Sequence, residues 1–346
     1  MIVDFKLFLV YDRKQGMSKL LQKMSKIVCL GGGSAMPKAV LKGLKKYPVK
    51  LSVICAMLDS GGSAGKEREM YKTNVSFGDI RRAFLALSGS SQEVKDAFNI
   101  RFKDGQYLGL VIANVLGTAM VTQDGNYKGD YESVLKVYRE VLKIPPQYEI
   151  LPATLEDADV CAVLEGGQIV SGEKNIDKPR HDKKLKIKKV FLKPEPNAYP
   201  KAVNAILKSD LIVIGPGDLY STLAQILLTK GVSEAVKKSK TKTVYICNLM
   251  TKDGETNGFS VIDFTDAIEN LLGKKLDFVV YNTKKPETSA IKKHQKEYPE
   301  LLDLVDFDEN LKKDKKFIGA DLLPQSGLVV HDSKKLAKII LNLCRQ

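Results

Sequence analysis

Short, continuous apolar runs alternate with amphipathic segments along most of this chain, and this alternation limits the folds that it can adopt. Strands with apolar side chains on both faces are typical of a parallel sheet that helices cover on both sides. The sequence therefore predicts an α/β fold with a Rossmann-like, mostly parallel sheet and helices on both faces. The clearest apolar runs lie at residues 26–30, 50–58, 149–154, 210–217, 242–250 and 276–283.

Between about residues 160 and 193 the pattern changes, because polar and apolar residues alternate there. The segment GGQIVSGE is typical of a hairpin turn, so we expect an inserted β-hairpin or lid element in this region. No low-complexity linker or internal repeat interrupts the rest of the chain. Residues 26–346 are thus predicted to form a single domain, and residues 1–25 an N-terminal extension without the features of a signal peptide.

The chain of 346 residues carries a formal net charge of +14. Its lysines are spread over nearly every expected helix and do not gather in one patch between aromatic residues, which favours a solvated basic surface over nucleic-acid binding. No apolar run approaches the roughly 20 residues that cross a bilayer. We therefore expect neither a nucleic-acid partner nor a membrane span.

The five cysteines are scattered without C-x-x-C spacing, and the three histidines lie in separate polar segments. This pattern indicates a reducing cytoplasm, offers no zinc site and lacks a Ser-His-Asp or Cys-His arrangement, so we expect no hydrolase activity. A general-base role stays open for Glu156 or Asp157, which could equally shape the floor of a pocket.

The first apolar run ends in three glycines, and an amphipathic helix pattern follows, over residues 26–47. Glycine lets a strand reverse into a helix within a few residues and leaves the backbone amides open to an anion. We expect this turn to contact a phosphate group; a tight turn without a ligand is the alternative, because neither standard phosphate-binding motif is matched. The candidate contacts are Gly31, Gly32, Gly33 and Ser34.

A second glycine turn, GPGDLYSTL, ends the run at residues 210–217 and opens another helix. Two such turns in one sheet predict a bipartite site, in which a pyrophosphate-bearing ligand lies between Gly33 and Gly217. Thr222 is a further hydroxyl donor. The candidate ligand contacts of this turn are Gly215, Gly217, Tyr220 and Ser221.

The segment after the second run, LDSGGSAGKEREMYKTNVSF, is predicted to be a long functional loop. Asp59 lies at the carboxyl end of the strand, where an acidic residue can accept hydrogen bonds from ribose hydroxyls. Gly61, Gly62 and Ser63, with Gly65, are placed to line a phosphate or a sugar.

Asp79 follows this loop at the start of the pattern IRRAFLAL. A carboxylate there is stabilised by the helix dipole, so a structural and a ligand-binding role stand equally open. Arg81 or Arg82 could clamp a phosphate, or could pair on the surface with Glu67 or Glu69.

After the run at residues 242–250, Asn248, Thr251 and Glu255 lie at the end of a strand. Asn248 could bind a base or a sugar amide. An asparagine that bonds its own backbone in a turn is the alternative.

Together these segments resemble the gluconeogenesis factor family, which belongs with the 2-phospho-L-lactate transferase-like (CofD-like) proteins. The resemblance covers about residues 26–345. The motifs that carry it, in order, are GGGSAMPKAVLKGLKKY, DSGGSAGKERE, FGDIRRAFLAL, LPATLEDADVCAVLEGG, VFLKPEP, LIVIGPGDLYSTL and YICNLMTKDGETNGFSV.

This resemblance implies a cytoplasmic bacterial protein that binds a nucleotide sugar such as UDP-N-acetylglucosamine or UDP-glucose and needs no cofactor. It implies a regulatory role in growth on gluconeogenic carbon, in cell shape and in the routing of carbon into peptidoglycan precursors. A regulatory protein partner is consistent with that role, and a homodimer is the default expectation. The related transferase branch joins a phospholactyl group to a deazaflavin with a metal held by aspartates, which here would be Mg²⁺ at Asp59 and Asp79.

The chain departs from the family pattern at positions that bear on the ligand. Ala35 replaces the last glycine of GGGTG, and Ser60 replaces the second carboxylate of DDGGSSG, which weakens the metal-dependent transferase reading. Gln106 and Leu110 replace the histidine and asparagine of H-x-L-G-N. Three hypotheses therefore stand: a nucleotide-sugar-binding regulator, a phospholactate-type transferase, and a degenerate member that binds no small molecule.

Overall fold

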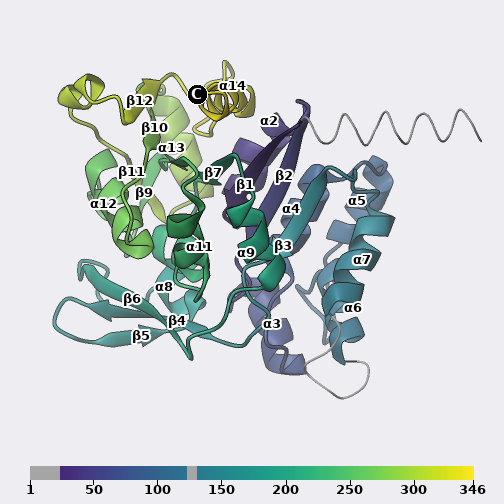
Figure 1. Ribbon diagram of the computed structural model, residues 1–346. Helices are drawn as coiled ribbons and strands as arrows, with labels where there is room; N and C mark the ends of the chain where they lie inside the picture. The colour runs from purple at the N-terminus through teal and green to yellow at the C-terminus, as the bar shows by residue number, and fades with distance from the viewer. Residues whose placement is uncertain (1–23, 123–130) are drawn as a thin grey trace, which may run out of the picture.

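The computed structural model describes residues 24–122 and 131–346, and its centre is a seven-stranded sheet (Figure 1). All neighbouring strands in this sheet are parallel. In spatial order the strands are β12 (Phe317–Ala320), β10 (Phe278–Asn282), β8 (Thr243–Ile246), β7 (Leu211–Ile214), β1 (Ser25–Leu30), β2 (Val49–Cys55) and β3 (Tyr148–Pro152).

Both faces of the sheet are covered, which explains why its strands are continuous apolar runs. In β1, Ile27 and Cys29 point into one hydrophobic cluster, and Val28 and Leu30 into the other. The first cluster packs against η1 (Pro37–Leu41), α2 (Lys42–Leu44), α4 (Gly78–Leu87), α7 (Tyr131–Val141) and α14 (Ser333–Cys344). The second packs against α9 (Pro200–Leu207), η2 (Leu219–Leu223), α10 (Ala224–Leu227), α11 (Val232–Ser239) and α12 (Val261–Leu272).

The strand order reverses at β1, which lies between β2 and β7. The chain first extends the sheet through β2 and β3 and then returns to the other side of β1 through β7 and β8. Because the two connections run over opposite faces, a crevice forms at the carboxyl ends of the two central strands. Both predicted glycine turns begin at this point.

The predicted insertion is confirmed as a separate three-stranded antiparallel sheet of β4 (Asp159–Leu164), β5 (Ile169–Ser171) and β6 (Ile187–Lys193). Gly166 and Gly167 make the β4–β5 turn with positive φ angles of 91° and 88°. The short helix α8 (Glu173–Asp177) follows β5 and lies beside this sheet in Figure 1. The lysine-rich segment at residues 182–189 becomes a strand only from Ile187 onward.

The predicted long loop after β2 is wrong over much of its length, because α3 (Gly62–Tyr71) forms there. Residues 66–70, KEREM, are strong helix formers, and they outweigh the glycines before them. Strand β12 was not anticipated from the sequence. The remaining elements are α5 (Gln92–Asn99), α6 (Ile112–Thr122), α13 (Thr288–Glu297), η3 (Glu309–Lys313) and the antiparallel pair β9 (Met250–Lys252) and β11 (Leu301–Leu304).

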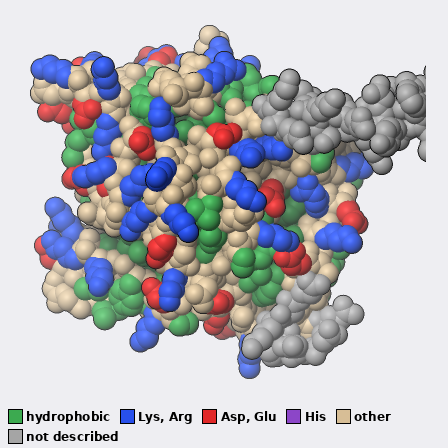
Figure 2. All heavy atoms as spheres, viewed as in Figure 1, with side chains coloured by type: hydrophobic (Ala, Val, Ile, Leu, Met, Phe, Trp, Pro, Cys, Tyr) green, Lys and Arg blue, Asp and Glu red, His purple; other side chains and the backbone are tan. Residues whose placement is uncertain are grey.

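The surface in Figure 2 shows lysine and arginine side chains scattered among acidic and apolar ones over one face of the molecule. None of the helices in the two described segments is long and apolar enough to cross a bilayer. Most of the predicted N-terminal extension, residues 1–23, lies outside the described residues.

Candidate functional site

A polar cavity of about 330 Å³ lies at the carboxyl end of the sheet, between the turns that follow β1 and β7. The start of α3, the start of α4, α6 and α8 complete its wall. Seven of the predicted ligand-binding residues line it: Gly33, Asp59, Gly61, Gly62, Ser63, Asp79 and Arg81. The lining residues outside that predicted set are Ala64, Gly78, Arg82, Arg101, Asn114, Glu173, Lys174, Asp177, Lys178, Asp218 and Thr222.

The glycines of the first turn have different structural roles. Gly33 has a positive φ of 61° and lines the cavity, and a Cβ there would meet no atom within 4 Å. A Cβ on Gly32 would lie 1.9 Å from Oδ2 of Asp79. Gly31 makes room for Met36, whose Cε would lie 2.8 Å from an added Cβ. Only Gly33 therefore presents its backbone to the cavity, and Ser34 is exposed outside it.

Asp79 lies both at the start of a helix and in the wall of the cavity. It lies in the first turn of α4, is 1% exposed, and its Oδ1 accepts a hydrogen bond from Arg82. Asp79 lines the cavity, and its buried Oδ2 has no hydrogen-bond partner. A buried carboxylate oxygen without a partner costs about 1–3 kcal/mol, which a bound ligand could recover.

Asp59 lines the same cavity as Asp79, and burial, then Asp79 and Glu173, raise its pKa well above the usual value. Burial, followed by Asp177, likewise raises the pKa of Glu173 to about 7. These neighbouring carboxyl groups disfavour one another's charged forms. A cationic group bound between them would relieve this repulsion.

Ser60 connects the loop after β2 to α8. Its backbone amide donates to Oε2 of Glu173 at 3.0 Å, and its hydroxyl accepts from the amide of Lys174 at 2.9 Å. The side chain at position 60 therefore caps α8 instead of facing Asp79. Ser60, which stands where the family pattern has a second carboxylate, thus holds the start of α8 in place.

The second glycine turn is held by neighbouring side chains. The carboxylate of Glu255 accepts hydrogen bonds from the amides of Tyr220 (3.0 Å) and Ser221 (3.3 Å) and from the Ser221 hydroxyl (2.7 Å). Both amide atoms of Asn248 bond the backbone of Gly217. The donors of this helix start are thus engaged within the protein.

Several predicted contacts consequently lie outside the cavity. Asn248 was expected either to bind a ligand or to bond its own backbone, but both of its amide atoms bond the backbone of Gly217 instead. Thr251 is 1% exposed and pairs with the backbone of Asp303 in the β9–β11 ladder. Gly215 accommodates Met36, whose Cε would lie 2.2 Å from an added Cβ. From this turn, only Asp218 and Thr222 line the cavity.

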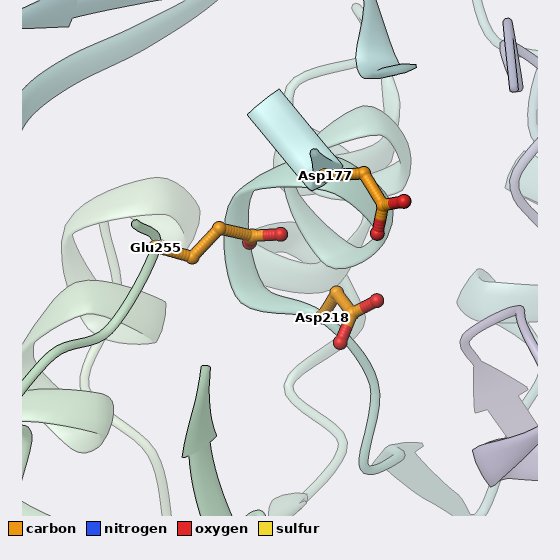
Figure 3. A group of neighbouring side chains, drawn as sticks. All are labelled: Asp177, Asp218 and Glu255. Carbon is orange, nitrogen blue, oxygen red and sulfur yellow. The ribbon is translucent and has the colours of Figure 1, made fainter. Parts of the chain in front are cut away.

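Three carboxylates, from α8, from the turn after β7 and from the turn after β9, converge beside the cavity: Asp177, Asp218 and Glu255 (Figure 3). Lys252 occupies their centre. Its Nζ lies 2.8 Å from Asp218 and 3.0 Å from Glu255 and also pairs with Asp177. Burial alone would lower the pKa of Lys252, but the three carboxylates raise it well above the usual value. The ammonium group thus supplies the positive charge that a metal ion would bring.

Arg81 and Asn114 are buried residues of the wall, 4% and 1% exposed. Nη1 of Arg81 donates to Asn99, but its Nε has no partner, and neither has Oδ1 of Asn114. Burial, then the nearby Arg82, lowers the pKa of Arg81 to about 10. No sequence motif pointed to Asn114, because α6 reaches the cavity only through tertiary packing.

The two candidate general bases, Glu156 and Asp157, make structural contacts within the protein. Glu156 accepts hydrogen bonds from the backbone and side chain of Asn197, and Asp157 pairs with Arg68 at 2.8 Å. Neither lines the cavity. The segment after β3 that carries Glu156 and Asp157 is therefore tied to α3 and to the loop before α9.

Known proteins share this architecture. The family model for 2-phospho-L-lactate transferase CofD matches residues 27–323. The chain belongs to the CofD-like gluconeogenesis factor family. It is 37% identical over 325 residues to the gluconeogenesis factor of Listeria innocua, across 91% of this chain and 94% of that protein.

Other relatives extend the family likeness over nearly the whole chain. The gluconeogenesis factor of Bacillus subtilis is 33% identical over 327 residues, across 93% of this chain and 98% of that protein. A crystal structure of a UPF0052 family member from Bacillus halodurans gives a TM-score of 0.82 at 30% identity, across 92% of this chain and 99% of that one. The family assignment and the fold therefore agree.

Proposed function

We propose that this protein binds a nucleotide sugar of the UDP-N-acetylglucosamine or UDP-glucose class and acts as a cytoplasmic regulator, without catalysis of its own. The observation that carries this proposal is the position of Gly33, whose left-handed backbone borders a polar cavity at the switch point of the sheet. Ligands of open α/β sheets bind in this crevice, and a bare backbone lets a phosphate approach closely.

The charges around the cavity favour an anionic ligand. Arg82 pairs with Asp79, and Lys252 pairs with Asp177, Asp218 and Glu255, so part of the negative charge beside the cavity is balanced within the protein. Each of these pairs is at least partly buried, which strengthens its attraction relative to water.

The other two carboxyl groups of the cavity carry less negative charge than exposed ones would. The pKa of Asp59 is raised by burial and by Asp79, and the pKa of Glu173 is raised to about 7. These two carboxyl groups therefore repel a diphosphate less than fully ionised carboxylates would. The cations that remain for a ligand are Arg81, Arg101, Lys174 and Lys178.

Calorimetric titration of the full chain with UDP, UDP-glucose and UDP-N-acetylglucosamine tests this proposal. We expect Gly33→Ala to weaken binding about tenfold or more, equivalent to about 1.4 kcal/mol, because the methyl group stands where the phosphate approaches. Gly327→Ala is the matched control: Gly327 also has a positive φ (74°) with no atom within 4 Å of an added Cβ, but it lies away from the cavity. Failure of folded wild-type protein to bind any UDP compound would overturn the proposal.

The name of the curated relatives, gluconeogenesis factor, supports a role in carbon metabolism. We extend it to the routing of carbon into cell-wall precursors and to cell shape, through a protein partner and with a homodimer as the working unit. Sedimentation with and without UDP-N-acetylglucosamine tests the assembly. A monomer in both conditions would contradict the dimer.

A metal-dependent transferase of the CofD type is the second candidate, favoured by the partnerless Oδ2 of Asp79 beside Asp59. These two carboxylates suit a hard cation such as Mg²⁺, which would neutralise the phosphates of a donor substrate. Turnover of a phosphate-bearing donor with a deazaflavin acceptor and Mg²⁺ would favour this candidate. Ligand binding without turnover would favour the regulator.

A further inference from the structure

Two deeply buried polar side chains in the cavity wall have hydrogen-bonding capacity that the protein does not use. Arg81 on α4 and Asn114 on α6 are 4% and 1% exposed, and both line the cavity. Nε of Arg81 is a donor without a partner, and Oδ1 of Asn114 is an acceptor without one. Native proteins rarely leave such groups unsatisfied, so a ligand in the cavity is a candidate partner for both of them.

The surroundings hold both side chains in place. Nη1 of Arg81 bonds Asn99. Glu67, 2% exposed, accepts a hydrogen bond from Ser63 at 2.6 Å, and Ser63 in turn accepts one from the amide of Val111.

Asn114 and Arg81 both lower the pKa of the buried Glu67 carboxyl group. Burial raises the pKa of Glu67, while Ser63, Asn114, Val111 and Arg81 act in the opposite direction. Asn114 thus lies near Glu67, and Oδ1 of Asn114 and Oε2 of Glu67 are both acceptors without a hydrogen-bond partner.

The chemistry of the wall selects a neutral ligand group. A phosphate only accepts hydrogen bonds, so it would satisfy Arg81 but would be repelled by Oδ1 of Asn114 and by the carboxylate of Glu67. A hydroxyl or an amide both donates and accepts, and it could satisfy Arg81 and Asn114 together.

The lining of the cavity also excludes a nucleobase from this place. None of its lining residues is aromatic, and alanine is the largest aliphatic one. Bases are commonly held by stacking on flat apolar side chains, whereas sugars are held by polar groups that match their hydroxyls. At about 330 Å³ the cavity is also at the lower end of ligand pockets, which suits part of a nucleotide sugar.

We propose that Arg81 and Asn114 form the subsite that recognises the hydroxyl or acetamido groups of the sugar, with the diphosphate near Gly33 and the base outside the cavity. This assignment rests on the proposed function. It predicts that the sugar adds affinity beyond that of UDP, and that this added affinity depends on Asn114.

The experiment compares UDP, UDP-glucose and UDP-N-acetylglucosamine by calorimetric titration on the wild-type chain and on Asn114→Leu. Leucine keeps the volume and removes the acceptor. We expect the variant to lose about tenfold in affinity for the UDP-sugars and to bind UDP within about twofold of wild type. Thr118→Val, one turn along α6, equally buried and outside the cavity, is the control for disturbance of the helix.

Arg81→Lys provides a second variant if Asn114→Leu does not fold, because it keeps the charge and removes Nε. It should reduce the preference for UDP-sugars over UDP. Equal losses for UDP and the UDP-sugars in the folded variants would overturn the subsite, as would equal wild-type affinity for UDP and both UDP-sugars. Absence of binding by every UDP compound would instead overturn the proposed function and the subsite together.

Discussion

Nζ of Lys252 lies 3.0 Å from the carboxylate of Glu255, and the same Glu255 carboxylate holds the amides of Tyr220 and Ser221 at the start of η2. This buried ion pair thus helps to hold the second glycine turn. Through Asp177 and Asp218, Lys252 also connects the lid helix α8 to that turn. The network therefore links α8 to the turns after β7 and β9, three segments that are far apart in the sequence.

We expect Lys252→Met to lower the free energy of unfolding by about 3–5 kcal/mol, because it leaves buried carboxylates without a cation. Lys275→Met is the control, since Lys275 also pairs with a buried glutamate, Glu269, but its own side chain is 82% exposed. That variant should cost less than about 1 kcal/mol. Urea unfolding measures both values, and similar small losses would show that the Lys252 network is not a major source of stability.

Gly32→Ala should disturb the site through Asp79, because the new Cβ would lie 1.9 Å from Oδ2 of a carboxylate that Arg82 holds in place. We expect a loss of about 1–3 kcal/mol in stability. In the Asp79→Ala background the clash is absent, so Gly32→Ala should cost much less there. Additive losses in this double-mutant cycle would contradict the proposed contact.

The raised pKa of Glu173 predicts a pH-dependent stability of the ligand-free protein. Its pKa is raised from 4.5 to about 7, so the folded state favours the protonated acid. The stability due to this group is complete below about pH 4.5 and is lost as the pH rises through 7, by at most about 3 kcal/mol.

Glu173→Gln should remove this dependence, because glutamine can still accept the hydrogen bond from Ser60 but cannot ionise. The variant should be more stable than wild type at pH 8 and similar to it near pH 4.5. Glu165→Gln, on an exposed glutamate of the same insertion, serves as the control. Urea unfolding between about pH 4.5 and pH 8 measures the free energy of unfolding of each variant. The same pH dependence in Glu173→Gln and in wild type would show that Glu173 is not the group responsible.

The local pattern of apolar residues was sufficient to predict much of the fold. The runs that became β1, β2, β3, β7, β8 and β10 were predicted from continuous apolar residues, because both faces of each strand are buried. The segment at α3 was predicted wrongly, because its glycines and serines suggested a loop although helix-forming residues follow them. Strand β12, only four residues long, gave too short a pattern to be distinguished.

For the site, the sequence alone determined the glycine turn at Gly33 and the acidic groups Asp59 and Asp79, because turn geometry and strand ends are properties of local sequence. Only the tertiary structure decided whether the amides of the second glycine turn bond a ligand or another part of the chain. The amides of Tyr220 and Ser221 could face a ligand or another part of the chain, and Glu255, more than thirty residues later, takes them.

The same holds for Arg81, Asn114 and Glu173, which come from separate segments and meet only when α4, α6 and α8 pack around the cavity. Their burial and their unused hydrogen-bonding atoms depend on that packing. Sequence can determine which backbone is free to bend and which strands are buried. The partner of each polar group is decided by tertiary packing, because hydrogen bonds and ion pairs depend on distances between residues far apart in the chain.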